Sequence, residues 1–70
     1  MKRDEFYNKT PTQVRVLIRK MRIKKDDILD LLEECNEYQL GDCDLTIMEL
    51  CKKHEEAIKD WLWDMFCEAQ

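Results

Sequence analysis

One proline and one glycine, Pro11 and Gly41, are the only residues of their types among the 70 residues of this chain, and serine is absent. Proline and glycine are the residues that most often interrupt regular structure. A chain with so few of them favours helices joined by short connections. The same scarcity excludes two kinds of catalytic site, because a phosphate-binding glycine loop needs several glycines and a serine nucleophile needs a serine.

The first predicted helix spans residues 11–22. Thr10 is a suitable N-cap, Pro11 fits the first helical position, and Gln13 can complete a capping box. The apolar residues that follow recur at the spacing of one helix face. They are Val14, Leu17, Ile18 and Met21. An amphipathic helix is therefore expected directly after Thr10.

Two more helices are predicted, over residues 26–39 and 44–68. Gly41 can end the first of them, and Asp42 or Asp44 can cap the second. In both segments, mostly apolar residues recur at the helical period. The repeating residues are Ile28, Leu31, Leu32, Cys35 and Tyr38 in the first, and Ile47, Cys51, His54, Ile58, Trp61 and Met65 in the second. The expected fold class is all-α, with an antiparallel helical hairpin that turns near Gly41.

Residues 22–27 allow two interpretations. In one, Asp26 or Asp27 caps a new helix after a short turn. In the other, no glycine or proline interrupts the chain, so the first two helices are fused into one long helix. We favour the break. We therefore expect three helices, or two if the first two are fused, in a single helical domain over residues 10–70, preceded by an N-terminal arm over residues 1–9.

Charge is distributed unevenly along the chain. Residues 1–25 hold nine basic and two acidic side chains, a net +7, whereas residues 26–70 hold fourteen acids and three lysines, a net −11. Such asymmetry can serve the fold, a self-complementary dimer or a charged partner. No apolar run approaches the ~20 residues that span a bilayer. Because the charged N-terminus also lacks an apolar secretory stretch, we expect no membrane contact and a cytoplasmic protein with four reduced cysteines.

The end of the third predicted helix is apolar on two faces and predicts a protein interface. Trp63 and Cys67 fall outside the main apolar stripe, so they are covered by the first helix, by the arm at Phe6 and Tyr7, or by a partner. Exposed tryptophan and methionine are enriched at interfaces, and short chains often complete their core with a second copy. We expect a homo-oligomer, in the form of a helical-bundle dimer, or another protein partner. The interface candidates are Trp61, Trp63, Met65, Phe66 and Cys67.

The basic first helix is a candidate for nucleic-acid contact. Arg15, Arg19 and Arg22 share one helix face, and the order of elements is similar to a helix-turn-helix. The next predicted helix, however, begins with Asp26 and Asp27, and this is the wrong sign for entry into a DNA groove. Nucleic-acid binding is therefore an alternative to protein contact.

Two further alternatives use the acidic half. Its carboxylates could imitate nucleic-acid phosphates, which would make the chain an inhibitor of a nucleic-acid enzyme. Cys35, Cys51 and His54 could converge in a small zinc-binding module. The fourth candidate, Cys43, would lie about 12 Å away at the helical rise unless the loop folds back.

Catalysis is not expected, because no pattern places an orienting group and an oxyanion pocket beside a nucleophile. The sequence therefore predicts no catalytic residue, no cofactor-binding residue and no metal ligand as its leading interpretation. The leading prediction is a small non-enzymatic helical protein that acts by protein–protein interaction. It would be a regulator, inhibitor or assembly factor of the kind that phages and mobile elements encode.

Overall fold

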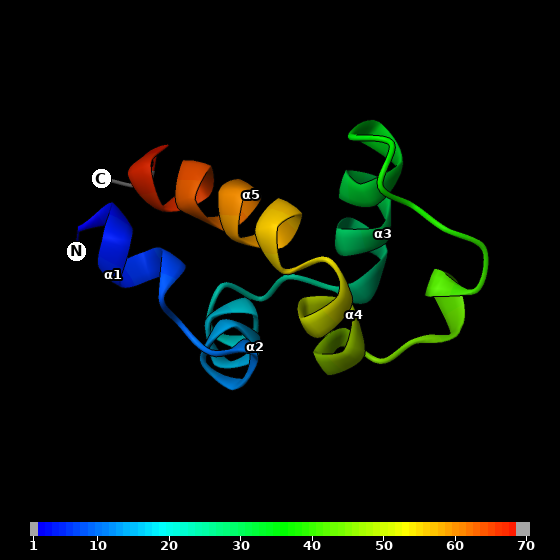
Figure 1. Ribbon diagram of the computed structural model, residues 1–70, viewed down its shortest axis with the longest axis horizontal. Coiled ribbons are helices and arrows are strands. Elements are labelled where there is room, and N and C mark those ends of the chain that lie inside the picture. Colours follow the sequence, from blue (N-terminus) through cyan, green and yellow to red (C-terminus); the bar gives the residue numbers. More distant parts are fainter. Residues whose placement is uncertain (1, 69–70) are drawn as a thin grey trace.

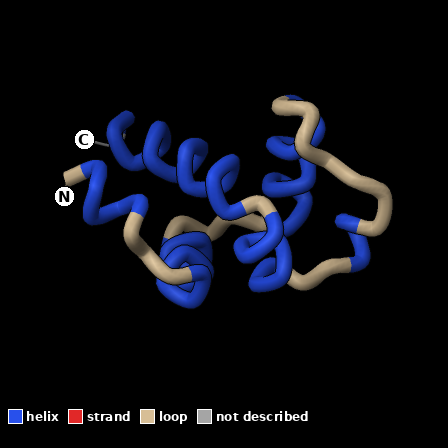
Figure 2. Tube along the Cα trace, viewed as in Figure 1, coloured by secondary structure: helices blue, strands red, loops and turns tan. Residues whose placement is uncertain are grey.

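The computed structural model describes residues 2–68, which form five α-helices and one short 3-10 helix (Figure 1). In chain order these are α1 (Arg3–Tyr7), α2 (Pro11–Lys20), α3 (Lys25–Glu34), η1 (Asp42–Asp44), α4 (Ile47–Lys53) and α5 (Glu55–Glu68). The described residues contain no strand (Figure 2), so the all-α prediction is confirmed. Among residues 2–68, no helix has both the length and the apolar composition that a bilayer crossing requires.

Two helices begin with capping boxes, of which one was predicted. Thr10 accepts the backbone N–H of Gln13 at 3.3 Å and donates its own N–H to the Gln13 side chain at 2.9 Å. Thr46 and Glu49 make the same pair of bonds, at 3.2 and 3.1 Å, in front of α4. The predicted start at residue 44 is therefore wrong, because a threonine and not an aspartate caps this helix.

Helices α2 and α3 both end in a left-handed turn at a residue other than glycine. Arg22 has a φ of 58° and Asn36 a φ of 60°. The residue after each turn donates its backbone N–H to the carbonyl five residues earlier, at 3.1 Å in α2 and 2.8 Å in α3. The break within residues 22–27 is confirmed, and α2 is two residues shorter than predicted. The predicted cap at Asp26 or Asp27 is wrong, because Lys24 is the N-cap of α3 and Asp27 accepts its backbone N–H at 3.0 Å from within the first turn. The predicted end at residue 39 is wrong, since α3 ends at Glu34.

The predicted helix over residues 44–68 is also wrong as a single element, because His54 interrupts it. The backbone of His54, at φ −116° and ψ 44°, lies outside the helical region and separates α4 from α5. Its imidazole Nε2 lies 2.9 Å from Asp42 Oδ2 in η1. Gly41, with a φ of 95°, precedes η1 and starts this turn instead of ending a helix. The helical spacing of the apolar residues continues across His54, so the sequence pattern alone could not reveal the break between α4 and α5.

Every α-helix contributes to one core. Helix α2 packs against α4, while α1, α3 and α4 all pack against α5. Figure 1 shows α1 beside the C-terminal end of α5, with α3 beyond its other end. The fully buried apolar residues are Phe6, Val14, Ile18, Ile28, Leu32, Leu50, Cys51, Ile58 and Leu62.

The segment expected as an arm contains α1, which covers part of α5. Phe6 is fully buried, and its ring centroid lies 5.3 Å from that of Trp63 and 6.3 Å from that of Phe66. Lys59, only 4% exposed, donates from Nζ to the backbone carbonyl of Tyr7 at 2.8 Å and also pairs with a glutamate one turn earlier. This bond satisfies a buried ammonium and ties the end of α1 to α5.

Replacing Leu32 with alanine is expected to lower the free energy of unfolding by about 2–5 kcal/mol, because the truncation leaves a cavity in the core. Leu40→Ala is the matched control, since Leu40 is fully exposed in the connection before η1. It should change the free energy of unfolding by less than about 0.5 kcal/mol. Urea denaturation followed by circular dichroism measures both variants, and similar losses in the two would contradict this core.

Replacing Arg22 with glycine is expected to raise the free energy of unfolding by about 0.5–1 kcal/mol. A left-handed conformation costs an L-residue about 1–2 kcal/mol, and the larger unfolded-state entropy of glycine cancels only part of the gain. Arg19→Gly removes the same charge within α2 and should lower the stability by up to about 1 kcal/mol. The same urea titration compares them, and a destabilised Arg22→Gly variant would contradict the left-handed turn.

Candidate protein-binding groove

A groove lies between α3 and α5, next to the turn that follows α2. It consists of two adjoining hollows of about 400 and 350 Å³, which share Leu31 and Trp61. Both side chains are partly buried, so they fill the base of the groove and still offer surface to a ligand. The apolar and cysteine side chains that line it are Met21, Ile23, Leu31, Cys35, Ala57, Trp61 and Met65.

Carboxylates surround this apolar lining. All seven are exposed, and none forms an ion pair within residues 2–68. They are Asp27, Asp30, Glu34, Glu37, Glu56, Asp60 and Asp64. Arg22 is the one basic residue among those that line the two hollows. The groove therefore carries a negative field that a cationic ligand would neutralise.

The local helix geometry explains this concentration of charge. Side chains three or four residues apart lie on one face of a helix. On α3 this spacing places acids on both sides of Leu31, and on α5 it places Glu56, Asp60 and Asp64 in one row beside Trp61. Of these acids, Asp60 also accepts the hydroxyl of Tyr7. Two acidic rows thus line the same apolar strip.

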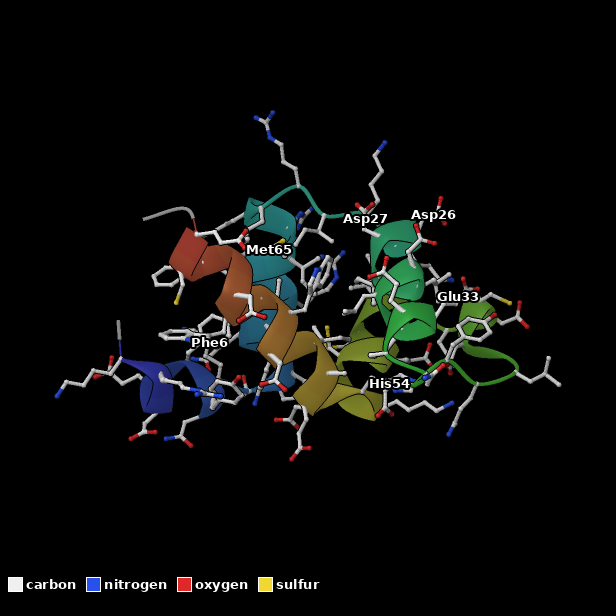
Figure 3. All side chains as sticks on the ribbon, turned by 90° about the horizontal axis from the view of Figure 1, so that it is seen from above. Phe6, Asp26, Asp27, Glu33, His54 and Met65 are labelled. Atoms are coloured by element: carbon white, nitrogen blue, oxygen red, sulfur yellow. The ribbon has the colours of Figure 1, made fainter. Side chains whose placement is uncertain are left out.

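The predicted interface residues divide between two faces of α5. Trp61 and Met65 line the groove. Trp63 and Phe66, with ring centroids 5.8 Å apart, pack with α1. Figure 3 shows Met65 and the Phe6 of α1 on opposite sides of α5. Cys67 is exposed and lines neither of the two hollows of the groove.

The predicted nucleic-acid residues lie along α2 and the turn after it. Arg15 is partly buried and lies near Cys51 of α4, whereas Arg19 and Arg22 are exposed. None of the three arginines forms an ion pair with any residue from 2 to 68. These three arginines are therefore not neutralised by ion pairs within the described residues.

The three zinc candidates are not brought together. Cys51 is buried in the core, Cys35 is exposed, and His54 pairs with Asp42. Burial raises the pKa of the Cys51 thiol, so this cysteine is a core side chain that resists ionisation. In the part of the chain that the structure describes, no three histidine, cysteine or acidic side chains are placed to hold a metal ion.

A buried charged cluster, absent from the sequence prediction, fixes the junction of α4 and α5. Asp42 is fully buried and accepts Lys53 Nζ at 2.6 Å and the Gln39 N–H at 2.8 Å. The Lys53 ammonium, helped by the backbone N–H of Gln39 and by His54, lowers the pKa of Asp42 to about 2. A carboxylate with three partners stays ionised despite its burial. No spacing rule relates Asp42 to a histidine twelve residues later, so the sequence held no signal for this contact.

Comparisons with models of protein families, with curated proteins and with solved structures give no match for this chain. Function must therefore be argued from the chain's own surfaces. Two surfaces stand out by their chemistry, the acidic apolar groove and the exposed basic side chains of α2.

Asp42→Asn is expected to lower the melting temperature at neutral pH. The melting temperature of the variant should also fall less than that of the wild type as the pH is lowered. The pKa of Asp42 is about 2 in the folded chain against an ordinary value of 3.8. Its charge therefore contributes stability that is fully present above the unfolded-state pKa and is lost as the pH falls through about 2. Thermal unfolding across this pH range should show the variant and the wild type converging toward the acid end. Asp44→Asn, at an exposed position in η1, is the matched control and should follow the wild type.

Proposed function

We propose that the protein is a small non-enzymatic interaction module that acts by protein–protein contact through the α3/α5 groove. The observation that supports this is the joint presence, in one groove, of an apolar strip and seven carboxylates that form no ion pair within residues 2–68. A ligand that fits both features is an amphipathic helix with apolar side chains on one face and lysine or arginine beside them. Laying such a helix in a groove is a common mode of peptide recognition.

The two kinds of side chain would have separate roles in binding. Trp61 and Leu31, shared by both hollows, are the apolar anchors, because large side chains near the centre of an interface supply most of its energy. The carboxylates around them would select a cationic partner and speed its association. The interface predicted from the sequence is thus proposed in a narrower form, with Trp61 and Met65 inside it and Trp63 and Phe66 engaged with α1.

Nucleic-acid contact through Arg15, Arg19 and Arg22 is the second candidate. It is supported by the absence of ion pairs to these arginines within residues 2–68. Arg22, however, lines the same hollow as three carboxylates, which would repel a phosphate backbone. The other alternative, an inhibitor whose carboxylates imitate nucleic-acid phosphates, is also less well supported. Its acids flank an apolar strip, and a surface that imitates phosphates does not need one.

As an interaction module the chain would serve as a regulator, inhibitor or assembly factor. Its four free cysteines fit the reducing cytoplasm. The hairpin expected from the sequence would correspond to α3 and the α4–α5 segment. The dimeric bundle expected from the sequence would be one form of such a contact and is not a condition for it.

A synthetic amphipathic helix of leucine and lysine tests the groove by calorimetry. The double variant Asp30→Lys/Glu34→Lys reverses two groove carboxylates and should weaken binding at least about tenfold, since each lost charge pair costs 1 kcal/mol or more. Asp26→Lys/Glu33→Lys makes the same charge change on α3 but outside the groove. Figure 3 shows Asp26 and Glu33 on the side of α3 away from α5.

The control variant should bind the peptide with nearly the affinity of the wild type. Equal weakening in both variants would mean that the peptide responds only to net charge, and the groove proposal would then fail. Circular dichroism of each variant confirms that the helices persist.

A further inference from the structure

The outer face of α2 has the chemistry that the groove lacks. Its exposed residues lie on one face of the helix and are Thr12, Gln13, Val16, Arg19 and Lys20. Val16 is 48% exposed, which is high for a valine within a helix. Beside it lies a shallow hollow of about 240 Å³, lined in part by Leu17 and Lys9. This face is therefore a small apolar patch bordered by basic residues.

The basic residues of this face have no acidic partner in their own chain. Lys9, Arg19 and Lys20 form no ion pair within residues 2–68, and no carboxylate lines the hollow beside Val16. The groove shows the reverse, with seven carboxylates and Arg22 as the one base among its lining residues. Each surface holds the charges that would neutralise the other.

We infer that the α3/α5 groove binds the outer face of α2 from a second copy of this chain. The inference rests on the proposed function, because it names the partner of the same groove. In the complex, Val16 packs against the apolar strip at Leu31 and Trp61, while Arg19 and Lys20 approach the carboxylates on either side.

The dimensions of the two surfaces agree with this contact. Helices α2 and α3 each have 10 residues, or about 15 Å at the rise of an α-helix. Arg19 and Lys20 lie on either side of Val16 on the outer face of α2, and acids of α3 and α5 lie on either side of the apolar strip, so each base can approach one acidic row. An apolar centre with a charged periphery is also the usual anatomy of a protein interface.

The two surfaces differ, so the contact is heterologous. It either closes reciprocally between two copies or continues from copy to copy. Because its charge pairs lie at the edge of the interface, salt should weaken it by screening. The net charge of −4 on every copy opposes association only at long range, whereas the local charges of the two faces attract.

Sedimentation of the full chain at low and high salt tests the inference. The wild type should self-associate, and high salt should reduce its apparent mass. Arg19→Glu/Lys20→Glu reverses the basic face, and Asp30→Lys/Glu34→Lys reverses part of the groove, so each variant alone should self-associate at least about tenfold more weakly. A mixture of the two should form a complex again, because the acidic α2 face of the first variant meets the groove of the second, in which two carboxylates are replaced by lysines. Asp26→Lys/Glu33→Lys, which lies outside the groove, should behave as the wild type.

A wild type that stays monomeric at every concentration would overturn the inference, and so would a mixture that fails to associate. If the monomeric protein still bound the leucine–lysine peptide in the groove, only the identity of the partner would be wrong and the proposed function would stand. A salt-sensitive shift of nucleic acid that disappears in Arg19→Glu/Lys20→Glu, without self-association, would assign the basic face to phosphates instead.

The charge reversals must leave the helices intact for these comparisons. Circular dichroism checks this for each variant. Should a reversal unfold the chain, the neutral variants Arg19→Gln/Lys20→Gln and Asp30→Asn/Glu34→Gln replace it. They should weaken self-association in the same direction by a smaller factor, and unchanged association in both would again overturn the inference.

Discussion

The buried carboxylate of Asp42 is the interaction on which the arrangement of the last three helices depends. It lies in η1, within the connection from α3 to α4, and contacts Lys53 and His54 where α4 gives way to α5. An isolated charge in the core would be unstable, so these partners must stay in place for the chain to remain folded. The cluster thereby holds the connection against the α4–α5 junction. The groove between α3 and α5 depends on that junction, because it sets where α5 begins.

The small size of the chain explains why even its first residues join the core. A domain of 70 residues buries a limited share of its surface, so each apolar side chain matters to its stability. Phe6 adds a fully buried ring, and Lys59 uses its buried amine to hold the carbonyl at the end of α1. With α1 in this place, Trp63 and Phe66 are partly enclosed by their own chain. The apolar surface of α5 that faces outward is therefore the side at Trp61 and Met65.

Local signals in the sequence predicted local structure well. The Thr10 capping box and the apolar row after it identified the start of α2, and the absence of strands followed from the helical period throughout. One error arose where a contact distant in sequence decides the backbone, since His54 leaves the helix to reach Asp42. The other errors are local, because Arg22 and Asn36 end their helices in left-handed turns. Asparagine is a common residue in such a turn, so Asn36 was a signal that the prediction missed, whereas an arginine there gives none. The groove could be foreseen only in part, since helical spacing reveals each acidic row but not that two rows line one groove.

The structure also shows that the basic and acidic halves of the chain form no ion pairs with each other within residues 2–68. Opposite halves of a sequence could neutralise each other on folding, yet the ion pairs within residues 2–68 join acids and bases of the second half alone. The bases of α2 remain on one surface and the acids of α3 and α5 on another. Separated charges of this kind add little to the stability of a monomer. Under the proposed self-association, the same charges would instead meet across the contact between two copies, where water is excluded.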